Sequence, residues 1–143
     1  MRRIAELCAG NSPPDNKNHP NYNFWNNYQP EYTTDGKHII VASQMGGLVS
    51  ALWIMNTDGS HKRQLTAPPL EASGADMAPD GRHTVFYSQQ NTNRPTSICV
   101  ARTDGSDLKR LTRPEQLVAA NPVYSPEGAK ILFNGPASVR STR

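Results

Sequence analysis

The feature that most constrains this chain is a phrase that it uses twice. The stretch IMNTDGSHKRQLT, which begins at Ile54, returns as VARTDGSDLKRLT at Val100, after a shift of 46 residues and with no gap between the copies. Self-similarity at a fixed period is the signature of repeat architectures, in which one small unit buries its faces against copies of itself. We therefore expect an array of like units.

A second phrase appears three times. It reads YTTDGKHIIVAS from Tyr32, MAPDGRHTVFYS from Met77 and YSPEGAKILFNG from Tyr124, and these copies are 45 and 47 residues apart. Each copy has an Asp-Gly or Glu-Gly pair followed by a β-branched or aromatic run. The glycine supplies the positive φ that a tight hairpin needs, and the branched residues suit a pleated strand. The phrase predicts a hairpin in each unit.

Each unit then adds two more short strands. The apolar runs at 52–55 and 98–101 lead into Asp-Gly-Ser turns, and the runs at 63–66 and 109–112 close the units with Leu-Thr. Four antiparallel strands in about 46 residues are typical of one propeller blade. The predicted fold class is all-β, a partial β-propeller of about two and a half four-stranded antiparallel blades. Its predicted divisions are a poorly ordered leader at 1–22, a first blade at 23–68, a second at 69–114 and an incomplete third at 115–143.

The turn and strand motifs resemble the TolB-type, WD-repeat-like β-propeller repeat. The motifs that carry the resemblance are APDGR, SPEGA, MNTDGS, ARTDGS, RQLT and KRLT, and the resemblance covers roughly residues 28–135. Similar blades occur in the periplasmic TolB component of the Tol-Pal envelope system, in prolyl-oligopeptidase-like serine peptidases and in some oligogalacturonate lyases. The resemblance therefore implies a repeat class, because a fold does not fix an activity.

The number of units conflicts with a closed ring. Full propellers have about four to eight blades, whereas this sequence holds two complete units and the opening hairpin of a third. An unclosed stack leaves sheet faces and strand edges uncovered. We expect either a fragment of a longer propeller protein or a chain that completes its ring by self-association.

The sequence lacks the common catalytic signatures. It contains no Gly-x-Ser-x-Gly elbow, no His-Glu-x-x-His pair, no phosphate-binding loop and no Cys-x-x-Cys. We therefore predict no catalytic residue, no metal site and no cofactor. His38 and His83 share one register, but Lys130 stands there in the third copy, which indicates a tolerant polar position.

The aspartates of the turns are predicted to cap those turns through backbone N–H groups. A calcium loop needs several oxygen ligands at alternate positions, whereas each turn here offers one carboxylate. The four turn aspartates are Asp35, Asp58, Asp80 and Asp104.

Glu31 and Asp76 are the candidate binding residues. Each lies one residue before the end of the first strand of its unit, the strand that lines the central channel of a propeller, and Val123 is their counterpart in the third unit. Two neighbouring carboxylates at a channel mouth could bind a cation or a basic peptide. The alternative is that they are solvated charges of the rim.

Other distinctive residues have structural explanations. Trp53 corresponds to Cys99 one unit later, which predicts packing between blades, with Cys99 as a free buried thiol. Basic residues on an outer strand discourage edge-to-edge aggregation, which accounts for the basic clusters at 61–63 and 109–110. The aromatic residues before the first unit either pack over it or anchor a partner; they are Tyr22, Phe24, Trp25 and Tyr28.

Charge and hydropathy narrow the partners. The net charge is only +3 and the basic residues are scattered, so nucleic acid is not expected. No apolar run approaches transmembrane length, so no membrane insertion is expected. The start lacks the apolar region of an export signal, although the resemblance implies a periplasmic location; the compartment stays unknown.

The favoured function is a non-catalytic protein- or peptide-binding module. The alternatives are the propeller of a serine peptidase whose hydrolase domain is elsewhere, or the propeller of an oligogalacturonate-lyase-like enzyme.

Overall fold

The computed structural model describes residues 27–45, 49–89, 96–113 and 119–135, which form ten strands and no helix. None of these residues belongs to a helix that could cross a membrane. The predicted leader at 1–22 lies outside the described residues, as do Tyr22, Phe24 and Trp25.

The strands form two four-stranded sheets and one two-stranded sheet, all antiparallel. In each sheet the strands follow one another in chain order. The predicted all-β partial propeller is therefore confirmed, whereas the division points between the units stay predictions. The first blade contains β1 (Asn27–Tyr32), β2 (His38–Ser43), β3 (Ala51–Asn56) and β4 (Arg63–Gln64); the second contains β5 (Glu71–Met77), β6 (His83–Gln89), β7 (Ser97–Arg102) and β8 (Lys109–Arg110); the third contains β9 (Ala120–Tyr124) and β10 (Ile131–Asn134).

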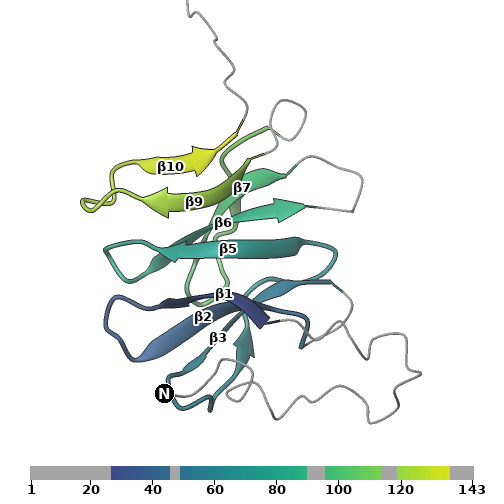
Figure 1. Ribbon diagram of the computed structural model, residues 1–143, viewed down its shortest axis with the longest axis vertical. Helices are drawn as coiled ribbons and strands as arrows, with labels where there is room; N and C mark the ends of the chain where they lie inside the picture. Colours follow the sequence, from purple (N-terminus) through teal and green to yellow (C-terminus); the bar gives the residue numbers. More distant parts are fainter. Residues whose placement is uncertain (1–26, 46–48, 90–95, 114–118, 136–143) are drawn as a thin grey trace, which may run out of the picture.

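The three sheets lie face to face in a stack (Figure 1). The first strand of the second blade, β5, contacts both β1 and β9, whereas the described outer strands β4 and β8 make no contact with each other. The blades therefore converge at their first strands and spread apart at their last ones. This radial arrangement makes β1, β5 and β9 the inner strands of the propeller.

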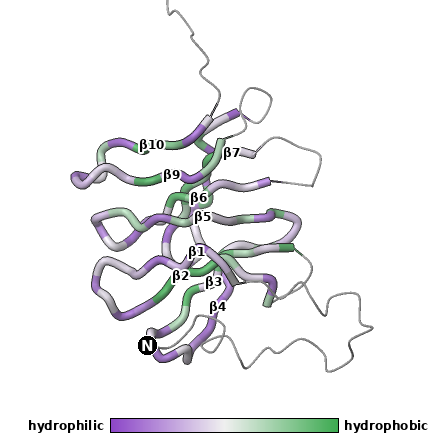
Figure 2. Tube along the Cα trace, in the orientation of Figure 1, coloured by the Kyte–Doolittle hydropathy of each residue, from purple (hydrophilic) through white to green (hydrophobic). Residues whose placement is uncertain are grey.

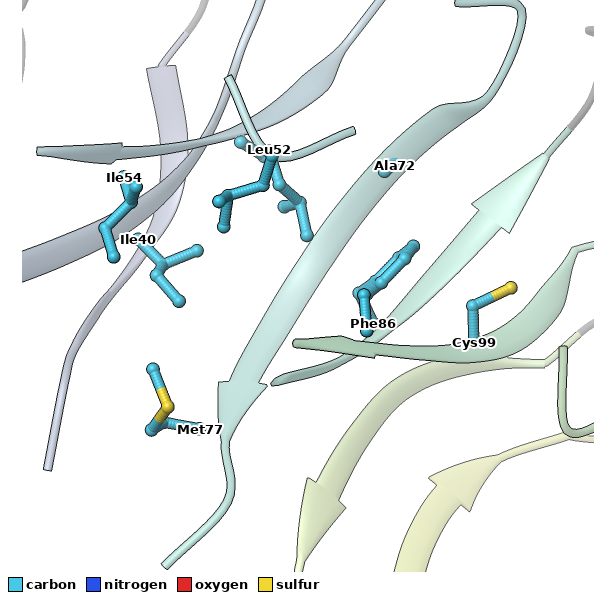
Figure 3. Packing of buried hydrophobic residues seen from close by; sticks show 10 residues of the cluster. Ile40, Leu52, Ile54, Ala72, Met77, Phe86 and Cys99 are labelled. Atoms are coloured by element: carbon cyan, nitrogen blue, oxygen red, sulfur yellow. The ribbon is translucent and has the colours of Figure 1, made fainter. Parts of the chain in front are cut away.

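The main core fills the space between the first two blades (Figure 3). Ile40 and Leu52 from the first blade meet Met77, Phe86 and Cys99 from the second. Cys99 is a free buried thiol, as predicted. The most hydrophobic stretches run along central strands such as β2 and β3, and the outer strand β4 is hydrophilic (Figure 2).

The central strands bury both of their faces. Phe86 belongs to the cluster shared with the first blade, while its neighbour Val85 packs with Ile131 and Phe133 of the third. Successive residues of a strand point to opposite faces, so a strand between two sheets needs a continuous apolar run. This explains why the sequence of β6 does not alternate between apolar and polar residues.

Trp53 is a packing residue, but it does not lie between the first two blades. It packs half-buried with Val41 and Met55 on the face of the first sheet that is turned away from the second blade. Its counterpart Cys99 occupies the corresponding face of the second blade, which is the seam with the first. The packing of Trp53 between blades therefore stays a prediction, because the first blade has no described sheet on that face.

Candidate functional site

The turn aspartates cap their own turns, as predicted. Backbone N–H groups two residues later donate to the carboxylates at 2.8 to 3.0 Å. The same turn is therefore built in successive repeats by the same bond. The donor and acceptor residues are Lys37 to Asp35, Ser60 to Asp58, Arg82 to Asp80 and Ser106 to Asp104.

These hydrogen bonds lower the pKa values of the turn carboxyls. The Thr33 hydroxyl is the largest cause for Asp35, and a serine hydroxyl two residues later is the largest for Asp58 and Asp104. For Asp80, partial desolvation is the largest single influence and acts to raise the pKa, but hydrogen bonds from Arg82 and His83, with the charge of His83, together outweigh it. A carboxylate that accepts such bonds holds its charge more readily.

The two histidines of the shared register lie beside their own turns. His83 Nδ1 is 2.6 Å from Asp80 Oδ2, and His38 Nδ1 is 4.0 Å from Asp35 Oδ1. Within the described ranges, no group of three or more His, Cys, Asp or Glu side chains could hold a metal ion. Each histidine therefore lies beside the aspartate of its own turn.

The inner strands share a distortion that the sequence analysis did not anticipate. A residue with positive φ occupies the same position in all three: Gln29 at 54°, Gly74 at 59° and Asn121 at 48°. Each of these residues lies within a shift of strand register, where the inner strand contains an extra residue. These shifts are β-bulges, which re-aim side chains.

The bulge decides where the candidate carboxylates point. In the register of β1 and β2, Tyr28 pairs with Ala42 and Glu31 with Ile40, so three steps on β1 match two on β2. Since side chains alternate between faces, the extra residue places Glu31 on the face of Ile40, which is directed toward the second blade. Without the bulge, Glu31 would lie on the opposite face. The same shift places Asp76 opposite Val85, on the face directed toward the third blade.

Asp76 uses its carboxylate to join two blades. Its Oδ2 atom accepts a hydrogen bond of 2.6 Å from the backbone N–H of Tyr124 in β9. A charged acceptor makes this bond stronger than a neutral pair would. Asp76 is therefore a structural tie between the second and third blades, a role that sequence reasoning missed.

Glu31 remains exposed and interacts electrostatically with Asp76. Partial desolvation, and then the negative charge of Asp76, raise the pKa of the Glu31 carboxyl above its usual value. The structure thus brings the two candidate binding residues together on neighbouring inner strands. Their counterpart Val123 offers no charge and is 44% exposed.

A cleft of about 770 Å³ opens between the turns of the first and second blades. Asp35, His38 and His61 line it from the first blade, with Arg82 from the second. The guanidinium of Arg63, also in the wall, donates at 2.8 Å to the backbone carbonyls of residues 103 and 104. Part of the predicted basic cluster therefore ties two blades together.

The fold matches solved propeller structures. A putative TolB from Agrobacterium tumefaciens aligns with a TM-score of 0.63 at 21% sequence identity, covering 78% of this chain and 43% of that one. TolB from Acinetobacter baumannii aligns with a TM-score of 0.62 at 20% identity, covering 76% of this chain and 26% of that one. The chain thus spans less than half the length of either structure. No protein-family model and no curated protein sequence matches it. The residues described here have the fold of part of a TolB-like β-propeller.

Proposed function

We propose that this chain is a non-catalytic, protein- or peptide-binding propeller module, and that its inner rim at Glu31 and Asp76 receives a basic group of the partner. The observation that carries the proposal is the placement of two carboxylates on neighbouring inner strands by the same bulge. Partial desolvation, and then repulsion from Asp76, raise the pKa of Glu31. An arriving lysine or arginine would offset this repulsion and favour the charged form.

The solved structures that support this proposal are described as TolB and putative TolB. This chain covers only part of each of these structures. A periplasmic location for this chain, and a partner that binds the complete ring, are therefore proposals as well. The peptidase and lyase alternatives stay predictions, since no observation in the described residues favours either one. Self-association that completes the ring also stays a prediction.

The experiment is a titration of the full chain with fluorescein-labelled pentalysine, followed by fluorescence anisotropy. We expect saturable binding that weakens as salt rises, because exposed charges are screened. Glu31→Gln should reduce the affinity several-fold. The matched control is Glu127→Gln, which neutralises an exposed glutamate on a turn of the third blade and should leave the affinity unchanged.

Asp76→Asn is a less direct test because Asp76 also accepts the Tyr124 N–H. The proposal fails if Glu31→Gln and Glu127→Gln weaken binding equally, or if labelled pentaglutamate binds as well as pentalysine. Equal effects would show a general attraction of the surface and no specific role for the inner rim.

A further inference from the structure

A second cleft, of about 500 Å³, lies between the first two blades beside their outer strands. Its walls are mainly apolar. The first blade supplies the segment that follows β4, including Leu65 and Leu70, and the second blade supplies parts of β7 and β8 with the turn between them. Each of these two sheets has four described strands. The cleft therefore lies between two complete sheets, and not at an uncovered end of the stack.

Leu108 and Arg110 line this cleft from the side of the second blade. Arg110 pairs with Cys99 across β7 and β8, and directly paired residues of neighbouring strands share a face. Cys99 belongs to the core cluster between the first two blades. Since side chains alternate along a strand, Leu108 shares this face, whereas Lys109 and Leu111 face the other way. The 51% exposure of Leu108 is therefore not a result of the short third sheet.

The two repeat copies differ at these wall positions. Where the second unit has Leu108 and Arg110, the first has Lys62 and Gln64. The second unit thus adds an apolar side chain and a cation on the face that is turned toward another blade. The space between packed elements is normally filled to close-packed density, whereas Leu108 is half exposed beside an open space. This combination indicates room for a ligand that has an apolar part and an anionic part.

Arg110 is the charged group that the cleft offers to such a ligand. Among the described residues, neither a hydrogen bond nor an ion pair holds its guanidinium. The carboxylate of Asp107 is 3.1 Å from the ammonium group of Lys109, which has the repeat position of Arg63. The charge of Asp107 is therefore already balanced. The hydroxyl of Thr66, which also lines the cleft, accepts a backbone N–H of β3 at 2.9 Å.

A small amphiphile suits this chemistry better than a peptide segment does. Sites for small ligands are typically about 300 to 1000 Å³ and mostly apolar, with a few polar groups that orient the ligand. A carboxylate matches the fork of an arginine guanidinium with two parallel hydrogen bonds. A peptide segment would also bring backbone N–H and C=O groups, each of which needs a partner when it leaves water. Among the described wall side chains, Arg110 is the main such partner.

We propose that this cleft binds an aliphatic carboxylate, with its chain against Leu70 and Leu108 and its carboxylate on the guanidinium of Arg110. The chain gains free energy by leaving water against these leucines, and the ion pair determines which end of the ligand lies at β8. The site is separate from the Glu31 rim and does not rest on the function proposed for that rim.

The test is a calorimetric titration of the full chain with hexanoate, octanoate and decanoate, each kept below the concentration at which it forms micelles. We expect saturable binding of one molecule per chain, with an affinity that rises by up to about fourfold for each added CH₂ group. Octan-1-ol has as many carbons as octanoate but no charge. It should bind at least about fivefold more weakly, because it lacks the charge-assisted hydrogen bonds to the guanidinium.

Two pairs of variants locate the site. Arg110→Gln introduces the residue of the first copy and should weaken octanoate binding at least about fivefold. Arg113→Gln removes the same charge from an exposed residue outside the described walls and should change the affinity by less than about twofold. Leu108→Gln should weaken binding about fivefold, whereas Leu111→Gln, which changes a leucine that is 50% exposed on the opposite face, should have less than about a twofold effect. Circular dichroism checks that each variant keeps the spectrum of the parent chain.

The comparison with octan-1-ol uses the parent chain and therefore stands even if a variant fails to fold. The proposal is overturned if octanoate and decanoate show no saturable binding, or if octan-1-ol binds as tightly as octanoate. Equal losses within either pair of variants would also overturn it, because they would show a general attraction to the surface. If the carboxylates failed and an acetylated peptide of alternating leucine and glutamate bound in a manner that Leu108→Gln abolished, the occupant would be a protein segment and the proposal would be wrong.

Discussion

The second strands of the three units place apolar side chains in one register but in very different surroundings. Ile40, Val85 and Leu132 occupy the same position, and they are 1%, 0% and 73% exposed. The first two side chains face a following blade, and the third faces no described sheet. Burial of the side chain at this position thus depends on whether another blade lies next to it. A single unit provides only one side of the interface between two blades.

The largest test of this comparison places a charge at the same position in two units. Val85→Asp buries a carboxylate in the seam between the second and third blades, where the described apolar neighbours offer it no cation. We expect a loss of more than about 4 kcal/mol in the free energy of unfolding, which approaches the whole stability of a small domain. Leu132→Asp should change it by less than about 0.5 kcal/mol.

Urea denaturation followed by circular dichroism measures both variants. If Leu132→Asp were as damaging as Val85→Asp, the face of Leu132 would be covered in solution. The comparison of the two units would then fail. A loss confined to Val85→Asp would confirm that blade contacts, and not the strand sequence, determine burial at this position.

The bulges of the inner strands allow a second comparison. Gly74→Ala adds a Cβ 2.5 Å from Tyr87 Cε1 at a φ of 59°, so both space and backbone conformation oppose it. We expect a loss of about 1 to 3 kcal/mol. Asn121→Gly, at the same position of the third unit, relieves a left-handed residue at a φ of 48° and should cost less than about 0.5 kcal/mol or stabilise slightly.

The readout is the free energy of unfolding from denaturant titration, with the slope of the transition checked for constancy. Equal losses for Gly74→Ala and Asn121→Gly would show that the bulge is not what constrains Gly74. Gly74→Ala made in a Tyr87→Ala background provides a control: the clash is absent there, so the further loss relative to Tyr87→Ala alone should be only the backbone part.

These bulges mark the limit of what the sequence predicted. Aligned repeats were sufficient for the strand order, the turn caps and the buried thiol of Cys99, because local turn chemistry and apolar runs determine those features. The direction of Glu31 was not predicted, since it depends on one extra residue in β1 that changes the face of every later side chain in that strand. A signal was present in the inner strands: Gln29-Pro30, Gly74-Ala75 and Asn121-Pro122 align.

The tie made by Asp76 was beyond sequence reasoning for a different reason. Its partner is a backbone N–H of the next blade, and any residue type except proline supplies that group. No pattern of side chains could therefore identify it. The exposure of Leu111 and Leu132 likewise follows from which strands are present around them, and not from their own repeat positions.

A smaller effect is expected from the turn contacts between blades. Arg63→Ala removes two charge-assisted hydrogen bonds to the turn of the second blade. Because the side chain is exposed, we expect a loss of only about 1 kcal/mol. Lys109→Ala makes the equivalent change where its only described ion pair is with Asp107 in the same blade, and should cost less than about 0.3 kcal/mol. Thermal melting compares the two, and a larger loss for Lys109→Ala would contradict the comparison.

The smallest effect is the pH dependence that separates the inner rim from the turns. The turn aspartates have lowered pKa values, so they stabilise the fold above the ordinary value of 3.8, and this contribution is lost as pH falls through their folded pKa values. Glu31 has a raised pKa, so its charge opposes folding at neutral pH, and the penalty is relieved as pH falls through that pKa toward the ordinary value of 4.5.

Glu31→Gln should therefore stabilise the chain at about pH 7, by less than about 0.5 kcal/mol because solvent screens the exposed side chain. The advantage should vanish at about pH 3, where both side chains are neutral. Urea midpoints across this range test the sign, with Glu127→Gln as the control; a Glu31→Gln variant that is less stable at neutral pH would show that the carboxylate has a favourable partner at the rim.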